Sequence, residues 1–268
     1  MANWSLKWFQ TMKVYWSNLF VYRTNFFLQT IGPLFVFLFI KLSLWTSIYL
    51  SSQKSIIGGY TLEEMLAYHL WIMVASMIIL TSSSQNLSED IRLGKISSYL
   101  IYPFSFWEFH ASNFAARQTV QVFIALLTVF ILLILLPTYF SNISFLFFIQ
   151  GLILSLMAGF FWFSLNYIIG LMAFWLEETW TLTVLTQVVT YFCSGAIIPL
   201  ELYPLWLKEA LFYTPFPYLG FVPVRTFMGE SLLFWQSVLV LLGWILLINL
   251  ISKLIWKKGI HLYTAAGM

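Results

Sequence analysis

Long apolar runs constrain this chain more than any other feature of its sequence. A helix needs about 20 mostly apolar residues to cross the hydrocarbon core of a bilayer, and the chain offers about six such runs. They cover residues 26–50, 60–83, 109–136, 145–175, 182–200 and 232–255. Because 61% of the residues are hydrophobic and 9% are charged, against about 25% charged in soluble domains, we predict an all-α integral membrane protein. Residues 1–268 form one domain, with no internal repeat.

The cations between the runs predict the orientation of the chain. If the N-terminus is cytoplasmic, only Lys54, Lys208 and Arg225 fall on the outer side, and all other Lys and Arg residues except Lys41, which stands within the first run, fall inside. Cytoplasmic loops carry an excess of Lys and Arg. We therefore predict a multi-pass protein with both termini in the cytoplasm.

Residues 1–24 precede the first run and carry an aromatic pattern of helical period. Trp4, Trp8, Met12, Tyr15 and Leu19 recur at spacings of three and four, so they share one face of a helix. Indoles and phenols prefer headgroup depth. We predict an amphipathic helix lying in the membrane interface, in contact with lipids; the alternative is an extension of the first span.

Two connections between runs are unusual. Residues 84–108 gather charge, with Glu89, Asp90, Arg92 and Lys95 between apolar anchors at Leu87 and Ile91. This predicts a short amphipathic helix, a turn and a re-entry into the bilayer, which suits a docking surface; the alternative is a solvated loop. Residues 201–228 are rich in both proline and apolar residues, which predicts short outer helices that re-enter the membrane between the fifth and sixth spans, rather than a seventh crossing.

Polar residues inside the runs fall on stripes. His69 and Ser76 in the second run lie seven residues apart. In the fifth run the polar residues recur at helical spacing; they are Thr183, Thr186, Gln187, Thr190 and Ser194. A polar stripe in a membrane helix faces protein or water. It indicates either a pathway wall or subunit seam, or hydrogen bonding between helices of one subunit.

Two further features lie within the runs. Lys41 stands midway along the first run, where an unpaired charge is costly, so it faces a cavity or partner, or marks a misplaced span boundary. Gly151, Ser155 and Gly159 form a ladder of small residues in the fourth run. Such ladders let another backbone approach closely, and we predict a packing role.

Catalytic and cofactor chemistry is hard to place in this sequence. Gly94-Lys95 lacks the remainder of a phosphate-binding Walker A loop, and His69, His110 and His261 are too dispersed for a metal site. A net charge of +3, scattered along the chain, does not indicate nucleic-acid binding. We predict no catalytic, cofactor or metal site in this chain.

Two segments resemble the ABC-2 type transporter permeases, in particular their small six-span exporter subunits. They are IRLGKISSYLIYPFSFWEF at residues 91–109 and KKGIHLYTAAG at residues 257–267. The resemblance implies a bacterial cytoplasmic-membrane subunit that pairs with a second permease copy or a related permease. It also implies two separate ATP-binding subunits, which hold the ATP and Mg²⁺.

The resemblance further implies roles for individual segments. The segment after the second span would be a coupling helix that docks on the ATPase through Glu89, Asp90, Arg92, Gly94 and Lys95. The second and fifth spans would line the pathway, and the outer segment would form a gate. The expected function is export of a hydrophobic or amphipathic substrate, such as a drug, lipid, glycolipid or peptide. The alternatives are an ion-coupled secondary transporter or a membrane-embedded lipid-modifying enzyme.

Overall fold

The chain is helical wherever its structure is described. The computed structural model describes residues 4–21, 23–80, 85–101, 104–140, 144–230 and 234–263, and within them it has one isolated β-bridge and no strand. The longer helices are α1 (Trp4–Val21), α2 (Arg23–Ser52), α3 (Leu62–Ile79), α6 (Phe106–Leu135), α7 (Phe145–Leu171), α8 (Trp180–Cys193) and α11 (Phe234–Leu262). The short helices are α4 (Gln85–Arg92), α5 (Ile96–Ile101), α9 (Leu205–Phe212) and α10 (Phe221–Phe227). Four 3₁₀ turns complete the described elements, η1 (Pro137–Phe140), η2 (Met172–Phe174), η3 (Leu200–Leu202) and η4 (Phe216–Leu219).

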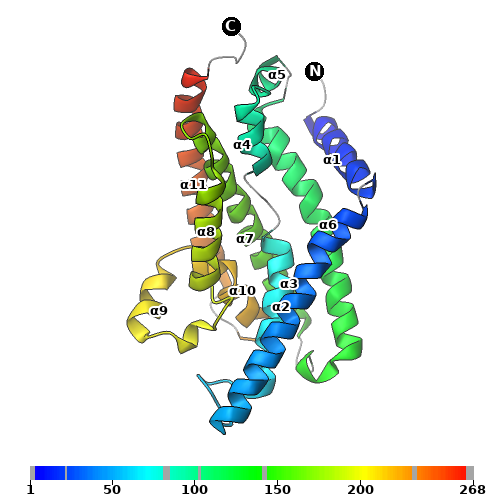
Figure 1. The fold of residues 1–268 in the computed structure, drawn as a ribbon, viewed down its shortest axis with the longest axis vertical. Coiled ribbons are helices and arrows are strands. Elements are labelled where there is room, and N and C mark those ends of the chain that lie inside the picture. Colours follow the sequence, from blue (N-terminus) through cyan, green and yellow to red (C-terminus); the bar gives the residue numbers. More distant parts are fainter. Residues whose placement is uncertain are drawn as a thin grey trace.

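The long helices form an elongated bundle with different elements at its two ends (Figure 1). Helices α4 and α5 lie at the same end as the N-terminus and the last turns of α11. Helix α9 and the connection from α2 to α3 lie at the opposite end. We call the first of these the α4–α5 end and the second the α9 end.

Four described helices are long and apolar enough to cross a membrane. They are α3, α6, α7 with η2, and α11, and they correspond to the second, third, fourth and sixth predicted runs. The apolar parts of α2 (Val36–Ser52) and α8 (Trp180–Cys193) are shorter. An all-helical, multi-pass membrane protein is therefore confirmed, whereas the complete six-span arrangement stays a prediction.

Helix α8 ends before the predicted run does, and the backbone explains why. The chain leaves the helix after Cys193, and Gly195 takes a φ of 79°, a left-handed conformation that favours glycine. The Gly195 carbonyl then accepts a hydrogen bond of 2.8 Å from the Tyr68 hydroxyl. With 14 residues, α8 is about 21 Å long, which is shorter than the hydrocarbon core.

Two span helices begin at capping boxes. At α3, the Thr61 hydroxyl accepts from the Glu64 N–H and the Glu64 carboxylate accepts from the Thr61 N–H. Ser105 and Glu108 repeat this exchange at α6. Each box satisfies two N–H groups that the first helical turn leaves unpaired. Because of its box, α6 begins at Phe106, three residues before the predicted run, and Glu108 belongs to a helix cap.

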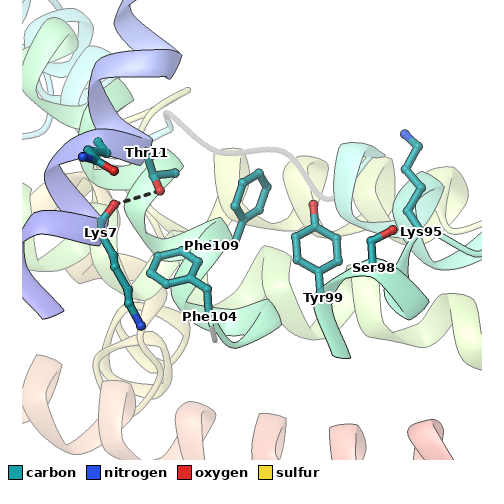
Figure 2. A pocket seen from close by; sticks show the side chains of 8 residues that line it. Lys7, Thr11, Lys95, Ser98, Tyr99, Phe104 and Phe109 are labelled. Atoms are coloured by element: carbon teal, nitrogen blue, oxygen red, sulfur yellow. Dashed lines mark hydrogen bonds between the residues drawn. The ribbon is translucent and has the colours of Figure 1, made fainter. Parts of the chain in front are cut away.

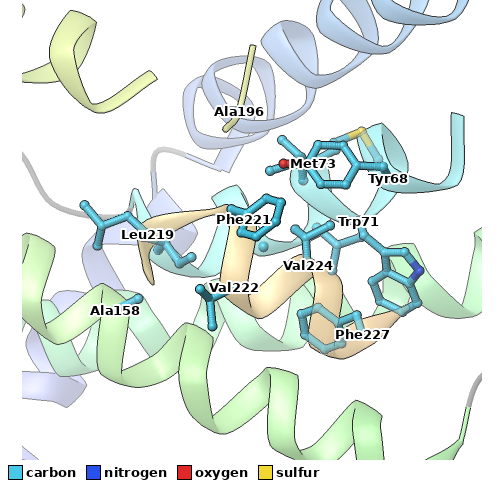
Figure 3. Packing of buried hydrophobic residues seen from close by; sticks show 14 of the residues in the cluster. Tyr68, Trp71, Met73, Ala158, Ala196, Leu219, Phe221, Val222, Val224 and Phe227 are labelled. Carbon is cyan, nitrogen blue, oxygen red and sulfur yellow. The ribbon is translucent and has the colours of Figure 1, made fainter. Parts of the chain in front are cut away.

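The core is built around α3 and α7. Helix α3 is mostly apolar and, from Met65 onward, almost entirely buried, and it contacts α2, α6, α7 and α10. Figure 3 shows α10 beside α3, where the rings of Phe227 and Trp71 stack with centroids 4.6 Å apart. A helix with apolar residues on most of its faces is stable when other helices cover those faces.

The small-residue ladder on α7 permits this packing, as predicted. A Cβ atom on Gly151 would lie 2.6 Å from the Phe227 ring, and one on Gly159 would lie 3.0 Å from the Ile78 carbonyl oxygen. Ser155, between them, is fully buried. These distances are too short for a side chain, so the glycines allow the close approach of α10 and α3.

The segment predicted to re-enter at the α9 end contains η3, α9, η4 and α10. Its one arginine, Arg225, has acquired partners from distant parts of the chain. It donates to the Tyr60 hydroxyl at 2.8 Å and forms ion pairs with Glu201 and Glu230. These contacts fasten α10 to the connection between α2 and α3. The depth of this segment in the membrane stays a prediction.

Helix α1 packs along α6, and its predicted aromatic face is turned toward protein. On the predicted face, Trp8, Met12, Tyr15 and Leu19 are half-buried. The neighbouring Trp16 indole donates to the Ala116 carbonyl of α6 at 2.9 Å. Leu6, Phe9, Val14 and Val21 are exposed apolar residues of this helix. The predicted helix is present, but the side of it that is free to meet lipid is the one that carries Phe9 and Val14.

Candidate functional site

The charged segment after α3 folds into two helices joined by a tight turn. Helix α4 ends in a Schellman motif, in which the Gly94 N–H bonds the Ile91 carbonyl at 3.2 Å and the Lys95 N–H bonds the Asp90 carbonyl at 3.0 Å. Gly94 has a φ of 72°, which the motif requires and which glycine adopts without steric cost. The predicted helix and turn are both present.

The apolar face of this segment is packed onto the C-terminal end of α7. Leu87, Ile91 and Ile96 are buried in a cluster with Leu171 and other residues of α6 and α7. A Cβ atom on Gly170 would lie 2.4 Å from Leu87, so α4 lies directly against the α7 backbone. The alternative of a solvated loop does not describe this segment, because its apolar side is fully covered.

Asp90 points inward and holds the turn together. Its carboxylate accepts from the Lys95 ammonium at 3.0 Å and from the Tyr99 hydroxyl at 3.4 Å, and lies 3.7 Å from His110 Nε2. The hydrogen bond to Asp90 raises the pKa of Lys95. Burial, followed by the Asp90 carboxylate, raises the pKa of Tyr99. The structure thus gives Asp90, predicted as a docking residue, a positioning role.

The outward side of the segment carries the remaining predicted residues. Glu89, Arg92 and Lys95 are exposed there, and Arg92 forms an ion pair of 3.0 Å with Glu178 from the connection between α7 and α8. Leu93, at the tip of the turn, is 61% exposed. We call these five residues the outer face of the turn.

Sequence reasoning missed Leu93 and the pairing with Glu178. From the sequence, Leu93 is expected to be buried like the neighbouring apolar residues, and only the geometry of the turn shows that it points outward. Glu178 did carry a signal, because it lies on the same predicted side of the membrane as Arg92 and has the opposite charge. A half-exposed ion pair of this kind contributes little to stability, so both side chains remain available to a partner.

The tail of the chain meets the turn. The Tyr263 hydroxyl donates to the Gly94 carbonyl at 2.7 Å, and a Cβ atom on Gly259 would lie 2.2 Å from Phe174 of η2. The two segments that carry the family resemblance are therefore in contact. Residues 102–103 of the first and 264–267 of the second lie outside the described residues.

Of the two predicted lining residues of α3, His69 is buried among aromatic rings. His69 stacks on Trp45 with centroids 5.7 Å apart, and no hydrogen-bond partner is found for either ring nitrogen among the described residues. Ser76 is half-buried in the last turn of α3. Lys41 of α2 is also buried, and its ammonium donates to the Ile197 carbonyl beyond the end of α8. Lys41 thus has a protein partner, one of the predicted alternatives.

The stripe on α8 faces the protein along most of its length. Thr190 and Ser194 are buried, Thr183 and Thr186 are half-buried, and Gln187 is exposed. The Thr183 and Thr190 hydroxyls donate to carbonyls four residues earlier in α8. The Ser194 carbonyl accepts from the Phe221 N–H at 2.8 Å. The Thr183 and Thr190 hydroxyls therefore use their protons within the chain's own helix, and the Ser194 carbonyl joins the end of α8 to α10.

The described residues contain no group of three His, Cys, Asp or Glu side chains that could hold a metal ion. Comparisons with curated proteins and with solved structures find no match. The sequence model of a family described as ABC-2 family transporter protein matches residues 35–267, from within α2 to the tail that contacts the turn. This match covers most of the chain, so the protein belongs to the ABC-2 family of transporters, whose membrane components operate with ABC ATP-binding subunits.

Proposed function

We propose that this chain is the permease subunit of an ATP-driven exporter in the bacterial cytoplasmic membrane, and that the outer face of the turn is its docking surface for the ATPase. One observation carries this proposal: one side of the turn is packed against α7, and the opposite side is exposed. Leu87 and Ile91 anchor it to α7, while Glu89, Arg92 and Leu93 are exposed. An exposed leucine ringed by charged groups has the composition of an interface centre with a polar rim.

The same geometry supports a route for mechanical coupling. A displacement of the turn acts on α7 through the Leu87–Gly170 contact and on α11 through the Tyr263–Gly94 hydrogen bond. Helix α7 packs against α3, α10 and α11. Since packed helices move as rigid bodies, closure of the ATPase would shift these spans together.

The assembly in this proposal contains two ATP-binding subunits, which hold ATP and Mg²⁺, and a second permease, either a copy of this chain or a relative. Both termini are cytoplasmic, which the distribution of Lys and Arg supports. The substrate is hydrophobic or amphipathic and passes along α3 and α8. Support comes from Thr183, Thr186 and Thr190, whose hydroxyl-bearing side chains share one face of an otherwise mostly apolar α8.

The test is copurification of the full-length chain with an ABC ATP-binding subunit, identified by its Walker A sequence, together with ATP turnover in membranes. Arg92→Glu and Leu93→Ser should each weaken assembly by about tenfold or more, as central interface residues do. Lys54→Glu and Leu205→Ser make the same changes at exposed positions of the α9 end and serve as controls. If all four variants assemble equally well, the docking assignment is wrong; if no ATP-binding subunit copurifies with the unmodified chain, the exporter proposal fails.

A further inference from the structure

A cavity of about 490 Å³ lies at the α4–α5 end, between α1 and the helices that follow the turn. Its volume falls within the range of small-ligand sites. The lining residues come from three places in the chain and are Lys7, Gln10, Thr11, Lys95, Ser98, Tyr99, Phe104 and Phe109. Of these residues, only Lys95 belongs also to the outer face of the turn, and Tyr99 also bonds Asp90.

The chemistry of the lining selects an anionic amphiphile. In Figure 2, the rings of Phe104, Phe109 and Tyr99 lie between Lys7 on one side and Lys95 on the other. All charged lining residues are therefore cations, and they flank an aromatic surface. The Lys95 ammonium donates to Asp90, but an ammonium has three donors. The Ser98 hydroxyl and the Gln10 amide supply further neutral donors.

The position of the cavity decides the source of that amphiphile. It opens beside α1, which exposes the apolar residues Leu6, Phe9 and Val14 next to the polar residues Gln10 and Lys13, a mixture that suits the membrane interface. Aromatic rings next to lysines are typical of headgroup depth. Basic pockets between helices on the cytoplasmic side bind anionic headgroups.

We propose that this cavity binds the headgroup of one anionic phospholipid from the cytoplasmic leaflet, with its phosphate attracted by both Lys7 and Lys95 at the two sides of the cavity and its glycerol backbone against Phe104 and Phe109. The choice of leaflet rests on the proposed function, which makes this end cytoplasmic. Because Lys95 follows the turn directly, a bound lipid would link α1 to the turn.

The test titrates the purified full-length chain with dioleoylphosphatidylglycerol and measures the first bound lipid by native mass spectrometry. Each lysine near an anionic headgroup contributes about 1 kcal/mol to binding. Lys7→Gln should therefore weaken this binding roughly fivefold, and the double variant Lys7→Gln with Lys95→Gln roughly thirtyfold. Lys7→Arg should retain binding. Lys13→Gln, an equal loss of charge at an exposed position of α1 outside the cavity, should have no effect.

Two further arms identify the ligand. Dioleoylphosphatidylcholine should bind more weakly than phosphatidylglycerol, and glycerol 3-phosphate should not displace the lipid. Equal binding of the two lipids, displacement by glycerol 3-phosphate, or equal losses in the Lys7 and Lys13 variants would each overturn the proposal. The experiment contains no ATPase, so its result is separate from that of the copurification experiment.

Discussion

Replacing Gly94 by alanine should loosen the turn without changing its outer face. Gly94 adopts a φ of 72°, and a residue with a Cβ atom pays about 1–2 kcal/mol in the left-handed conformation. The added Cβ would lie 3.4 Å from the Tyr263 hydroxyl oxygen, which is an ordinary contact, so steric overlap adds little. The cost is that of the backbone alone, and it should raise the population of opened turns about 5- to 30-fold.

Hydrogen exchange measures this opening directly. The amides of Gly94 and Lys95 are bonded to the carbonyls of Ile91 and Asp90, so they exchange only when the turn opens. Peptides that cover residues 88–99 should exchange faster in Gly94→Ala by the same factor, and ATP turnover by the assembled complex should fall. Gly94→Asn is the matched control, because asparagine tolerates the left-handed conformation better than alanine does. Exchange in Gly94→Ala equal to that of the unmodified chain would refute the assignment of Gly94 as the residue that shapes the turn.

Other substitutions separate positioning from contact. Asp90→Ala should speed amide hydrogen exchange across α5, since the loss of the Tyr99 hydrogen bond alone costs about 1 kcal/mol. Arg92→Ala should leave this exchange unchanged and weaken only ATPase assembly. Identical behaviour of the two variants in both assays would contradict these roles. Phe227→Ala should destabilise the bundle by about 3–5 kcal/mol through the cavity left beside Trp71, measured as a lower thermal midpoint; an unchanged midpoint would count against the core described here. The pKa of Tyr99 is raised above its usual 10.0, so the neutral phenol stabilises the turn below pH 10 and this contribution is lost as pH rises through the raised pKa. The thermal midpoint of the unmodified chain should therefore fall more above pH 10 than that of Tyr99→Phe, and equal falls in the two chains would contradict this role.

Much of the fold was predictable because a bilayer restricts what a sequence can do. Apolar runs of sufficient length predicted helices α3, α6, α7 and α11, and the small residues Gly151 and Gly159 predicted close packing on α7. The pattern of Leu87 and Ile91 predicted an amphipathic α4. In each case the relevant interaction is local in sequence or depends on side-chain size alone.

Other features depended on contacts between distant residues. Asp90 and Arg92 are two residues apart and both charged, yet one faces His110 and the other Glu178. The Lys41 ammonium donates to the Ile197 carbonyl. This carbonyl is not used within a helix, because α8 ends at Cys193. Composition and spacing carry no information about such partners, since each pair forms only after separate helices have packed.

The sequence by itself determined that this chain forms membrane-spanning helices with an amphipathic, charged segment after the second run, because hydrophobicity and period act residue by residue along the chain. The tertiary structure alone decided which side of that segment is exposed and what braces it. Packing of Leu87 against Gly170 orients α4, and the Tyr263 hydroxyl, 169 residues away, fastens the turn at Gly94. Those contacts form only after the ends of α7 and α11 have packed against α4. They fix the orientation of α4 and so determine which of its charged residues are exposed.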